Sequence, residues 1–359
     1  MIFFRFLSSR THKGVKALTT TLVSLFILLT GVLLIQPRLG QRRLLLHDRH
    51  LLTPMEVEEL PKGTLAVVLD RRLGQDERSF YYRLLRLVME RSGQPFVLGY
   101  STEVLPQDEA MNALASGHVN GDQNPTGITV GAYGAGLELN RRLLPIKIPL
   151  KGGLMGLRAG WTNRSNHPQL RQVSDLDELR ALVLLQGLGW SDVDIFDRAG
   201  LRTFTAAPQE RLRLVDNERV HLFPRGIAEL EWEAPEVRRT SSDLELDEHL
   251  LITYPFAGFF YVSRSNPSLA KAISTGFERV IAEGSYQRLL EEVVFTPWLR
   301  RHLKLHKRRV IHLRNPAAGL VFEGVDPRYW IVPWRALDQK RFTQGLQLCA
   351  LPRLKLLCQ

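Results

Sequence analysis

The sequence contains almost no cysteine. Its two cysteines, Cys349 and Cys358, both lie within the last eleven of the 359 residues. A disulfide framework or a thiolate metal site in the main part of the fold is therefore excluded. The sequence leaves open whether these two tail cysteines are bonded to each other.

Enzyme signatures are also missing. The chain has no Gly-x-Ser-x-Gly, no His-Glu-x-x-His and no Walker phosphate loop. The glycine-rich stretch "GAYGAG" (131–136) lacks the lysine that follows in a phosphate loop. His302 and His306 have the helical spacing of metal ligands, but cations crowd them and no carboxylate is near. We therefore predict a protein that is not an enzyme and that uses no metal or cofactor.

A basic core is absent as well, although the net charge is +11. Residues 62–296 hold 27 Lys and Arg against 30 Asp and Glu, so the basic excess lies in the flanks. A nucleic-acid-binding domain would carry its basic residues in its core region, so we predict no nucleic-acid partner. Residues 300–314 contain seven Lys and Arg and no acid. We predict that this stretch lies along an anionic surface, such as lipid head groups or an acidic partner.

The N-terminus carries the one long uncharged run. Residues 1–16 form a basic segment, and residues 17–35 contain no charge. At about 1.5 Å per residue, a helix of this length can span the roughly 30 Å of bilayer hydrocarbon. We predict a signal or membrane-anchor helix at 17–35, followed by a linker at 36–61. No small-residue cleavage site follows, so removal and retention both stay open.

The next part of the chain alternates strands with helices. "TLAVVLD" (64–70), "PFVLGYS" and "GITVGAY" are strand-like, whereas "ERSFYYRLLRLVMERSG" and "DEAMNALASG" have helical periodicity. Strands and helices that alternate without hairpin turns are typical of a parallel sheet covered on its faces.

A second lobe follows a change of pattern at Leu143. The stretch "LLPIKIPLKGGLMGLRAGW" is extended and interrupted by proline and glycine, which suits a crossing between lobes. Strand and helix patterns then alternate again, and "LLITYPFAGFFYV" runs back as two apolar strands. We predict a first lobe of 63–144 plus 257–315, a second lobe of 149–253 and a C-terminal extension of 316–359. The crossings at 145–151 and 254–257 should act as a hinge, because few contacts should oppose a backbone change there.

Four stretches carry a family resemblance: "IPLKGGLMGLRAGW", "LLQGLGWSDVDIFDRAGL", "RVHLFPRGIAELEWE" and "YPFAGFFYVSRSNPSLAKAISTGFERVIAEGSYQRLL". They resemble the type 2 periplasmic binding proteins, in particular the substrate-binding proteins of amino-acid ABC transporters (solute-binding protein family 3). The resemblance covers about 63–334. It implies an α/β fold of two lobes, each with a central sheet flanked by helices, and a ligand cleft between them.

The resemblance also implies a function. The lobes would close around a small polar solute, anionic or amino-acid-like, and deliver it to an ABC permease. The protein would be periplasmic, or membrane-anchored through 17–35 and facing the periplasm. The alternative is a sensory or interaction domain of the same fold that signals to a membrane partner without transport.

Relatives hold the carboxylate of their ligand on the backbone amides of a loop that matches "QGLGWSD" (186–192). Here Gly187 and Gly189 permit close approach, and a helix starting near Trp190, with Ser191 as a possible cap, would present its amides to an anion. The alternative is an ordinary strand-to-helix turn. Trp190 departs from the small hydroxyl residues of the family, which predicts a narrower pocket or one that stacks on an apolar ligand face.

Two further positions follow from the resemblance. Relatives place an aspartate near the end of a later strand, where this chain has Arg225. An arginine there would favour a carboxylate or phosphate, unless Glu229 or Glu231 neutralises it. In the first lobe, relatives clamp a carboxylate with an arginine, and Arg141 and Arg142 stand in roughly that place. The Thr-x-x-Arg spacing of the family is absent, and the alternative is a solvated helix end.

Overall fold

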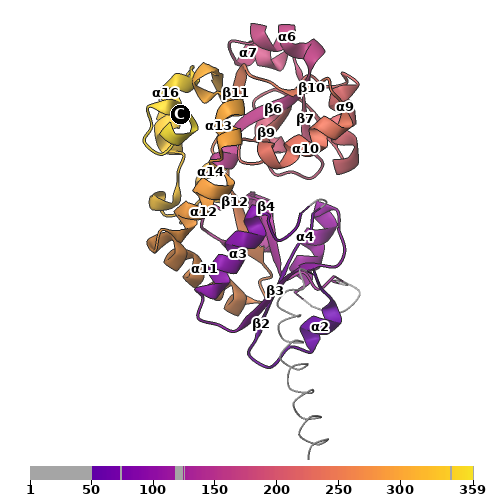
Figure 1. The fold of residues 1–359 in the computed structure, drawn as a ribbon, viewed down its shortest axis with the longest axis vertical. Coiled ribbons are helices and arrows are strands. Elements are labelled where there is room, and N and C mark those ends of the chain that lie inside the picture. Colours follow the sequence, from indigo (N-terminus) through magenta and orange to yellow (C-terminus); the bar gives the residue numbers. More distant parts are fainter. Residues whose placement is uncertain (1–50, 73–74, 118–123, 125, 340–341, 359) are drawn as a thin grey trace, which may run out of the picture. The chain divides into compact units, whose positions relative to one another are not determined.

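The fold was analysed in a computed structural model that describes residues 51–72, 75–117, 124, 126–339 and 342–358 (Figure 1). The chain divides into two units, Met1–His50 and Leu51–Gln359, and the described residues belong to the second. The predicted signal or anchor segment at 17–35 lies outside the described residues. Within the described ranges, no helix is long and apolar enough to cross a membrane.

The first lobe is built on a six-stranded sheet with the order β1-β3-β2-β4-β12-β5. Strands β1, β3, β2 and β4 are parallel, whereas β12 is antiparallel to its neighbours β4 and β5. The strands are β1 (Leu51–Leu52), β2 (Leu65–Leu69), β3 (Phe96–Ser101), β4 (Val130–Gly134), β5 (Leu144–Ile146) and β12 (Gly258–Val262). The helices are α2 (Pro54–Glu58), α3 (Phe80–Glu90), α4 (Gln107–Ser116), α5 (Leu137–Arg142), α11 (Pro267–Ala282) and α12 (Ser285–Val293).

Local sequence explains why these elements form. The side chain of Ser79 accepts a hydrogen bond from the backbone N–H of Tyr82 and so caps α3, whose apolar face is buried. Helix α3 packs closely on α11 because Gly276 has no side chain. A Cβ on Gly276 would lie 2.0 Å from the carbonyl oxygen of Val88.

The second lobe has its own sheet, with the order β10-β6-β11-β13 and with β9 also paired to β6. Strands β7 and β8 form a separate parallel pair. The strands are β6 (Leu157–Asn163), β7 (Val183–Gly187), β8 (Arg202–Ala206), β9 (Phe223–Gly226), β10 (Leu244–Leu246), β11 (Leu250–Thr253) and β13 (Arg309–His312). The helices are α6 (His167–Gln172), α7 (Leu176–Arg180), α8 (Val193–Arg198), α9 (Arg211–Asp216) and α10 (Leu230–Thr240). Separate sheets flanked by helices confirm the predicted α/β class with two lobes.

The predicted end of the first lobe at 315 is wrong. Strand β13 pairs in parallel with β11 of the second lobe, so the chain crosses a third time, between α12 and α13 (Pro297–Leu303). Residues 300–314 are also not one surface stretch, because Arg308 is fully buried. Its Nη1 donates to the carbonyl of Leu250 at 2.6 Å and lies 3.7 Å from Asp247. This burial anchors the start of β13.

The predicted linker at 36–61 is wrong at its C-terminal end. Residues 51–58 form β1 and α2, and β1 pairs in parallel with β3 at the edge of the first sheet. Apolar packing holds this segment on the sheet, because Leu52 and Val57 are buried in a small cluster against Val68 and Val97.

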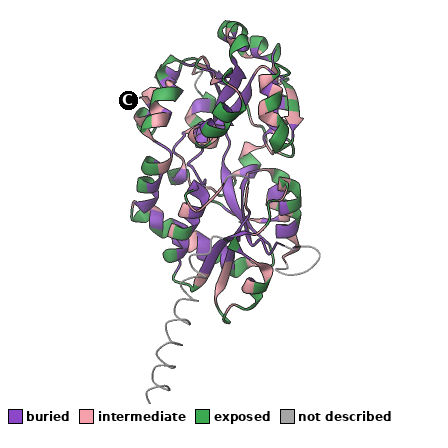
Figure 2. Cartoon of the chain, turned by 45° about the vertical axis from the view of Figure 1, so that its right-hand side comes forward, coloured by how far each residue is buried: buried purple, intermediate pink, exposed green. Residues whose placement is uncertain are grey.

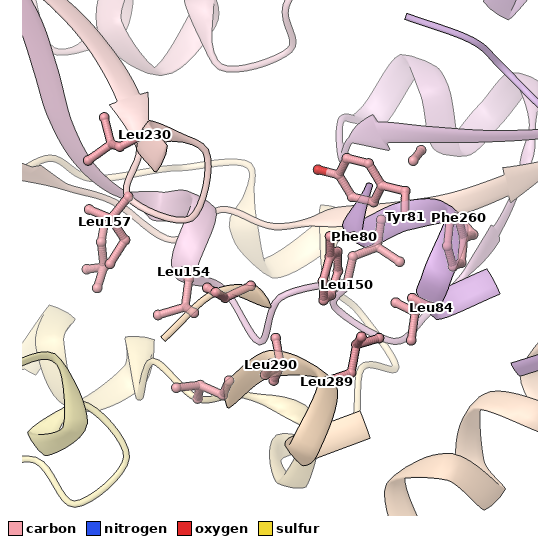
Figure 3. Close-up of a cluster of buried hydrophobic side chains, with 14 of the residues drawn as sticks. Phe80, Tyr81, Leu84, Leu150, Leu154, Leu157, Leu230, Phe260, Leu289 and Leu290 are labelled. Atoms are coloured by element: carbon pink, nitrogen blue, oxygen red, sulfur yellow. The ribbon is translucent and has the colours of Figure 1, made fainter. Parts of the chain in front are cut away.

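The first crossing is densely packed, which contradicts the expectation that few contacts oppose a hinge motion there. Leu150 and Leu154 are buried in one apolar cluster that also contains residues of both lobes. Figure 3 shows them between Phe80 of the first lobe, Leu230 of the second and Leu290 of α12. In the second crossing, residues 254–257 are buried as well (Figure 2).

The predicted C-terminal extension, 316–359, is folded over its described residues. It forms α14 (Ala318–Val321), α15 (Trp334–Gln339), α16 (Gly345–Cys349) and a 3-10 helix, η6 (Lys355–Cys358). Leu348 and Leu357 are buried against Leu303 and Leu305 in the main cluster. Cys349 and Cys358 form a disulfide, which answers the question left open by the sequence.

Candidate functional site

A small polar cavity of about 50 Å³ lies where strand ends of the two lobes meet. Strands β2 and β4 end there from the first lobe, and β7 and β9 from the second. In open α/β sheets, ligands bind outside the carboxyl ends of strands. The first lobe lines the cavity with Arg72, Gln107 and Gly134. The other lining residues are Met155, just after the first crossing, Phe256 in the second crossing, and Arg158, Trp190, Ser191, Asp192, Arg225 and Glu229 of the second lobe.

A larger hollow of about 680 Å³ exists elsewhere, along the edge strand β10. Its charged groups pair with one another, since Glu245 lies 2.6 Å from Arg164 and 3.2 Å from His167. It does not lie at the carboxyl ends of a parallel sheet. We therefore take the smaller cavity between the lobes as the candidate site.

Arg225 lines this cavity but its charge is already compensated. Its side chain is 9% exposed, and its Nη2 lies 2.5 Å from Glu233 and 3.3 Å from Glu229. Its guanidinium also lies 4.5 Å from the centre of the Trp190 ring. Burial alone would lower the pKa of Arg225, but the two glutamates raise it, so the side chain stays protonated. Glu229, which we considered, and Glu233, in place of Glu231, therefore neutralise Arg225 within the protein, and a role of Arg225 as a ligand clamp stays a prediction.

A second buried ion pair lies beside the first. Arg158 Nη2 is 2.6 Å from Asp192 Oδ2, and both side chains are almost completely buried. The hydroxyl of Tyr254 donates to the same carboxylate oxygen at 2.7 Å. The guanidinium of Arg158 lies 5.3 Å from the ring centre of Phe256. Two arginine–carboxylate pairs thus form one wall of the cavity, with their charges offset within the protein.

The loop at 186–192 does not form the anion cradle that we expected. Helix α8 begins at Val193, and its N-cap residue is Asp192, whose buried carboxylate places a negative charge at that position. Ser191 does not cap the helix. Its Oγ donates to the carbonyl of Gly134 at 2.9 Å and so joins the second lobe to the first.

Trp190 and the two glycines give this loop its shape. A Cβ on Gly187 would lie 2.1 Å from the indole of Trp190, so the ring lies flat on its own loop. The same ring stacks on Phe223 with centroids 6.1 Å apart. Gly189 adopts a φ of +75°, and its carbonyl accepts a hydrogen bond from Gln107 Nε2 at 3.4 Å. Trp190 and Ser191 therefore line the cavity. Gly189 permits the turn of the loop, and Gly187 leaves room for the indole to pack against the loop backbone.

Arg141 and Arg142 lie outside the cavity lining, on α5. Arg141 is 75% exposed and pairs with Glu138 at 2.5 Å. Arg142 Nη2 donates to Asn112 Oδ1 at 2.5 Å. The helix-end alternative fits both residues, and a clamp at this position stays a prediction without support from the cavity lining.

Arg72 is the cation that sequence reasoning missed. It is partly buried, lines the cavity and donates a hydrogen bond to the carbonyl of Ala132. Within the described ranges, no carboxylate forms a salt bridge with it. The nearby Asp70 is buried, which raises its pKa, and Arg72 only partly offsets that rise. One signal in the sequence could have identified it, because it lies two residues after the apolar strand "TLAVVLD" (64–70), at the strand's carboxyl end.

The network gives a pH-dependent stability. Burial alone would raise the pKa of Glu229, but Arg225, Lys151 and Arg158 lower it from 4.5 to about 2. A carboxyl whose folded-state pKa is lowered stabilises the fold above its unfolded pKa and loses this effect as pH falls. We expect the protein to lose on the order of 3 kcal/mol of stability between about pH 4.5 and pH 2 through this group.

The measurement is denaturant unfolding of the wild type and of Glu229→Gln at several pH values from 7 to 2. The variant should be less stable than the wild type at pH 7. The free energies of unfolding of the two proteins, plotted against pH, should converge near pH 2. Glu236→Gln, which changes an exposed residue of α10, is the control. Parallel curves for wild type and Glu229→Gln would contradict the assignment.

Comparisons with known proteins give likeness in structure only. No family model matches the sequence, and no curated protein matches it. The solved structures that it resembles include an amino acid ABC transporter substrate-binding protein from Streptococcus pneumoniae bound to L-arginine, at 12% identity and TM-score 0.47, covering 68% of this chain and 98% of that one.

Two other solved structures are similar to a comparable degree. One is an ancestral amino acid-binding protein, a precursor of cyclohexadienyl dehydratase, at 12% identity and TM-score 0.47, covering 67% and 99% of the two chains. The other is a histidine kinase sensor domain with similarity to periplasmic binding proteins, at 15% identity and TM-score 0.48, covering 64% and 96%. Substrate-binding proteins of amino-acid ABC transporters are thus among the structures that this chain resembles, as the sequence predicted.

Proposed function

We propose that the protein binds a small solute bearing a carboxylate between its two lobes, with Arg72 as the residue that holds the carboxylate. One observation carries this proposal. The cavity shared by the lobes is lined by three arginines and two carboxylates, and Arg72 is the arginine without a salt bridge among the described residues.

The chemistry favours an anionic solute over a cationic one. A guanidinium offers a planar fork of donors that matches the two oxygens of a carboxylate. Asp192 and Glu229 are engaged by Arg158 and Arg225, so they offer little to a ligand cation. Gln107 and Ser191 add neutral polar groups to the cavity lining.

Binding requires the lobes to open. A cavity of about 50 Å³ holds only a few water molecules, and sites for small ligands are usually about 300 Å³ or larger. The hydrogen bond from Ser191 to Gly134 joins the lobes across the cavity and must break for a solute to enter. The two lobes are therefore closed over the cavity in this structure.

The proposal is tested by thermal unfolding with a panel of solutes, followed by calorimetric titration. The panel contains acetate, glycine, succinate, glutamate, lysine and spermidine. Solutes with a net negative charge should raise the melting temperature, because a ligand that binds only the folded state stabilises it by mass action. No shift with any carboxylate, or a shift with spermidine alone, would contradict the proposal.

We further propose that the protein is extracytoplasmic and that it delivers the solute to an ABC permease. A second candidate function is signalling to a membrane partner. One observation favours it: the C-terminal extension (316–359) contacts Asn140 of the first lobe and β13 of the second, so opening of the lobes would move a surface that a partner can read. Uptake of labelled solute by cells lacking the protein separates the two, since only delivery predicts lost uptake.

A further inference from the structure

A segment of the C-terminal region, residues 313–334, runs over both lobes, and we name it the strap. Its contact with the first lobe is apolar. Val321 is buried in a cluster with Leu139 and Phe259 of that lobe. The ring of Phe322 meets Phe259 edge-on at 5.9 Å, and Asn140 Nδ2 donates to the carbonyl of Val321 at 2.9 Å.

The strap also binds the end of the first crossing, at Gly152 just after 145–151, and the second crossing, 254–257. At the first of these, the amides of Ile331 and Val332 donate to the carbonyl of Gly152 at 2.8 and 3.1 Å. Gly152 has a φ of +56°, and a Cβ there would lie 2.4 Å from Ile331, so the two segments are in close contact. At the second, Asn315 Nδ2 donates to the carbonyl of Pro255 at 2.9 Å.

Both ends of the strap are fixed to the second lobe. At its start, the amide of Leu313 donates to the carbonyl of Thr253, which continues the pairing of β13. Near its end, Arg353 Nη1 donates to the carbonyl of Trp330 at 2.5 Å. Arg353 belongs to the disulfide loop 349–358, whose buried leucines pack with α13 and the 3-10 helix η4 (Leu305–Lys307).

We propose that the strap restrains the opening of the lobes and thereby sets how fast a solute reaches the cavity. Opening changes backbone angles in the segments that join two lobes. Here these segments are buried and hydrogen-bonded to a third segment that is held on both lobes. Opening therefore has to detach either the strap's contact with the first lobe or its contacts with the crossings. The part of this inference that concerns solute access rests on the proposed function.

The test measures the distance between the lobes without ligand. Spin labels are attached at Glu90→Cys on α3 and Arg239→Cys on α10, which are exposed positions, and pulsed EPR gives the distance distribution. The full chain should give one narrow distribution. Adding Asn315→Ala and Phe322→Ala should broaden it towards longer distances by several ångströms, while the protein remains folded.

The matched control is Leu320→Ala, which changes a residue of α14 that is 66% exposed. It should leave the distribution unchanged. An unchanged distribution in the folded Asn315→Ala and Phe322→Ala variant would overturn the proposal.

A second measurement covers the case in which that variant does not fold. Amide hydrogen exchange in the unmodified protein should protect residues 150–156 as strongly as the strands of both lobes, and exchange that is clearly faster there would overturn the proposal. Neither the EPR distance nor the hydrogen exchange needs a ligand. A wrong proposal about the strap can therefore be distinguished from a wrong proposal about solute binding. If carboxylates bind, stopped-flow association should be several-fold faster in the strap variant than in Leu320→Ala, and equal rates would overturn control of access.

Discussion

Replacing Arg225 with alanine is expected to lower the free energy of unfolding by about 3–5 kcal/mol, since removing one partner of a buried ion pair leaves an uncompensated buried charge. Arg225 is the shared partner of Glu229 and Glu233, and its guanidinium also lies against Trp190. Its loss leaves two partly buried carboxylates close together and removes the support beneath the indole. Chemical denaturation at pH 7 measures the effect.

Two controls separate this explanation from a general effect of losing an arginine. Arg141→Ala removes an exposed arginine that pairs only at the surface, and should change stability by less than about 0.5 kcal/mol. Arg225→Met combined with Glu229→Gln and Glu233→Gln removes the whole charged group and should recover most of the loss. If Arg225→Ala cost less than about 1 kcal/mol, the carboxylates would be solvated rather than buried, and the network as described would be wrong.

The parts of the fold that the sequence predicted are those with local signals. Helix α3 was expected from its apolar period and the glycine at 93, and it spans Phe80–Glu90. Strand β13 was missed because its apolar residues, Val310 and Ile311, lie within a run of basic residues. Its place in the sheet depends on parallel pairing with β11, far away in sequence, and on the burial of Arg308. Neither can be read from a local pattern.

The site shows the same limit. Sequence reasoning brought Arg225, Trp190 and Ser191 to the cavity and named Glu229 as a partner of Arg225, which the structure confirms. It missed the closer partner, Glu233, which lies eight residues along, on α10, beyond the one turn that we considered. Arg72 was missed because its importance depends on which strand ends face the second lobe, and that is a property of the assembled sheets.

Replacing Arg72 with glutamine is expected to weaken binding of a carboxylate solute by about ten- to a hundredfold, the equivalent of about 1.5–3 kcal/mol for a charge-assisted hydrogen bond. Stability should fall by no more than about 1 kcal/mol, because Arg72 is only partly buried and its loss removes one hydrogen bond, to the carbonyl of Ala132, but no salt bridge among the described residues. Arg72→Lys keeps the charge but loses the planar fork of donors, so its affinity should lie between that of the wild type and that of Arg72→Gln.

Calorimetric titration of the best solute from the panel checks this prediction, with Arg141→Gln as the control for the loss of one positive charge in the same lobe. Arg141 lies outside the cavity lining, so its replacement should leave the affinity unchanged. Arg72→Gln should thus lose affinity and keep most of its stability, whereas Arg225→Ala should lose stability. Full affinity in Arg72→Gln would remove Arg72 as the carboxylate clamp. Equal loss in both variants would show that the solute responds to the overall charge of the lobe rather than to one guanidinium at the carboxyl end of β2.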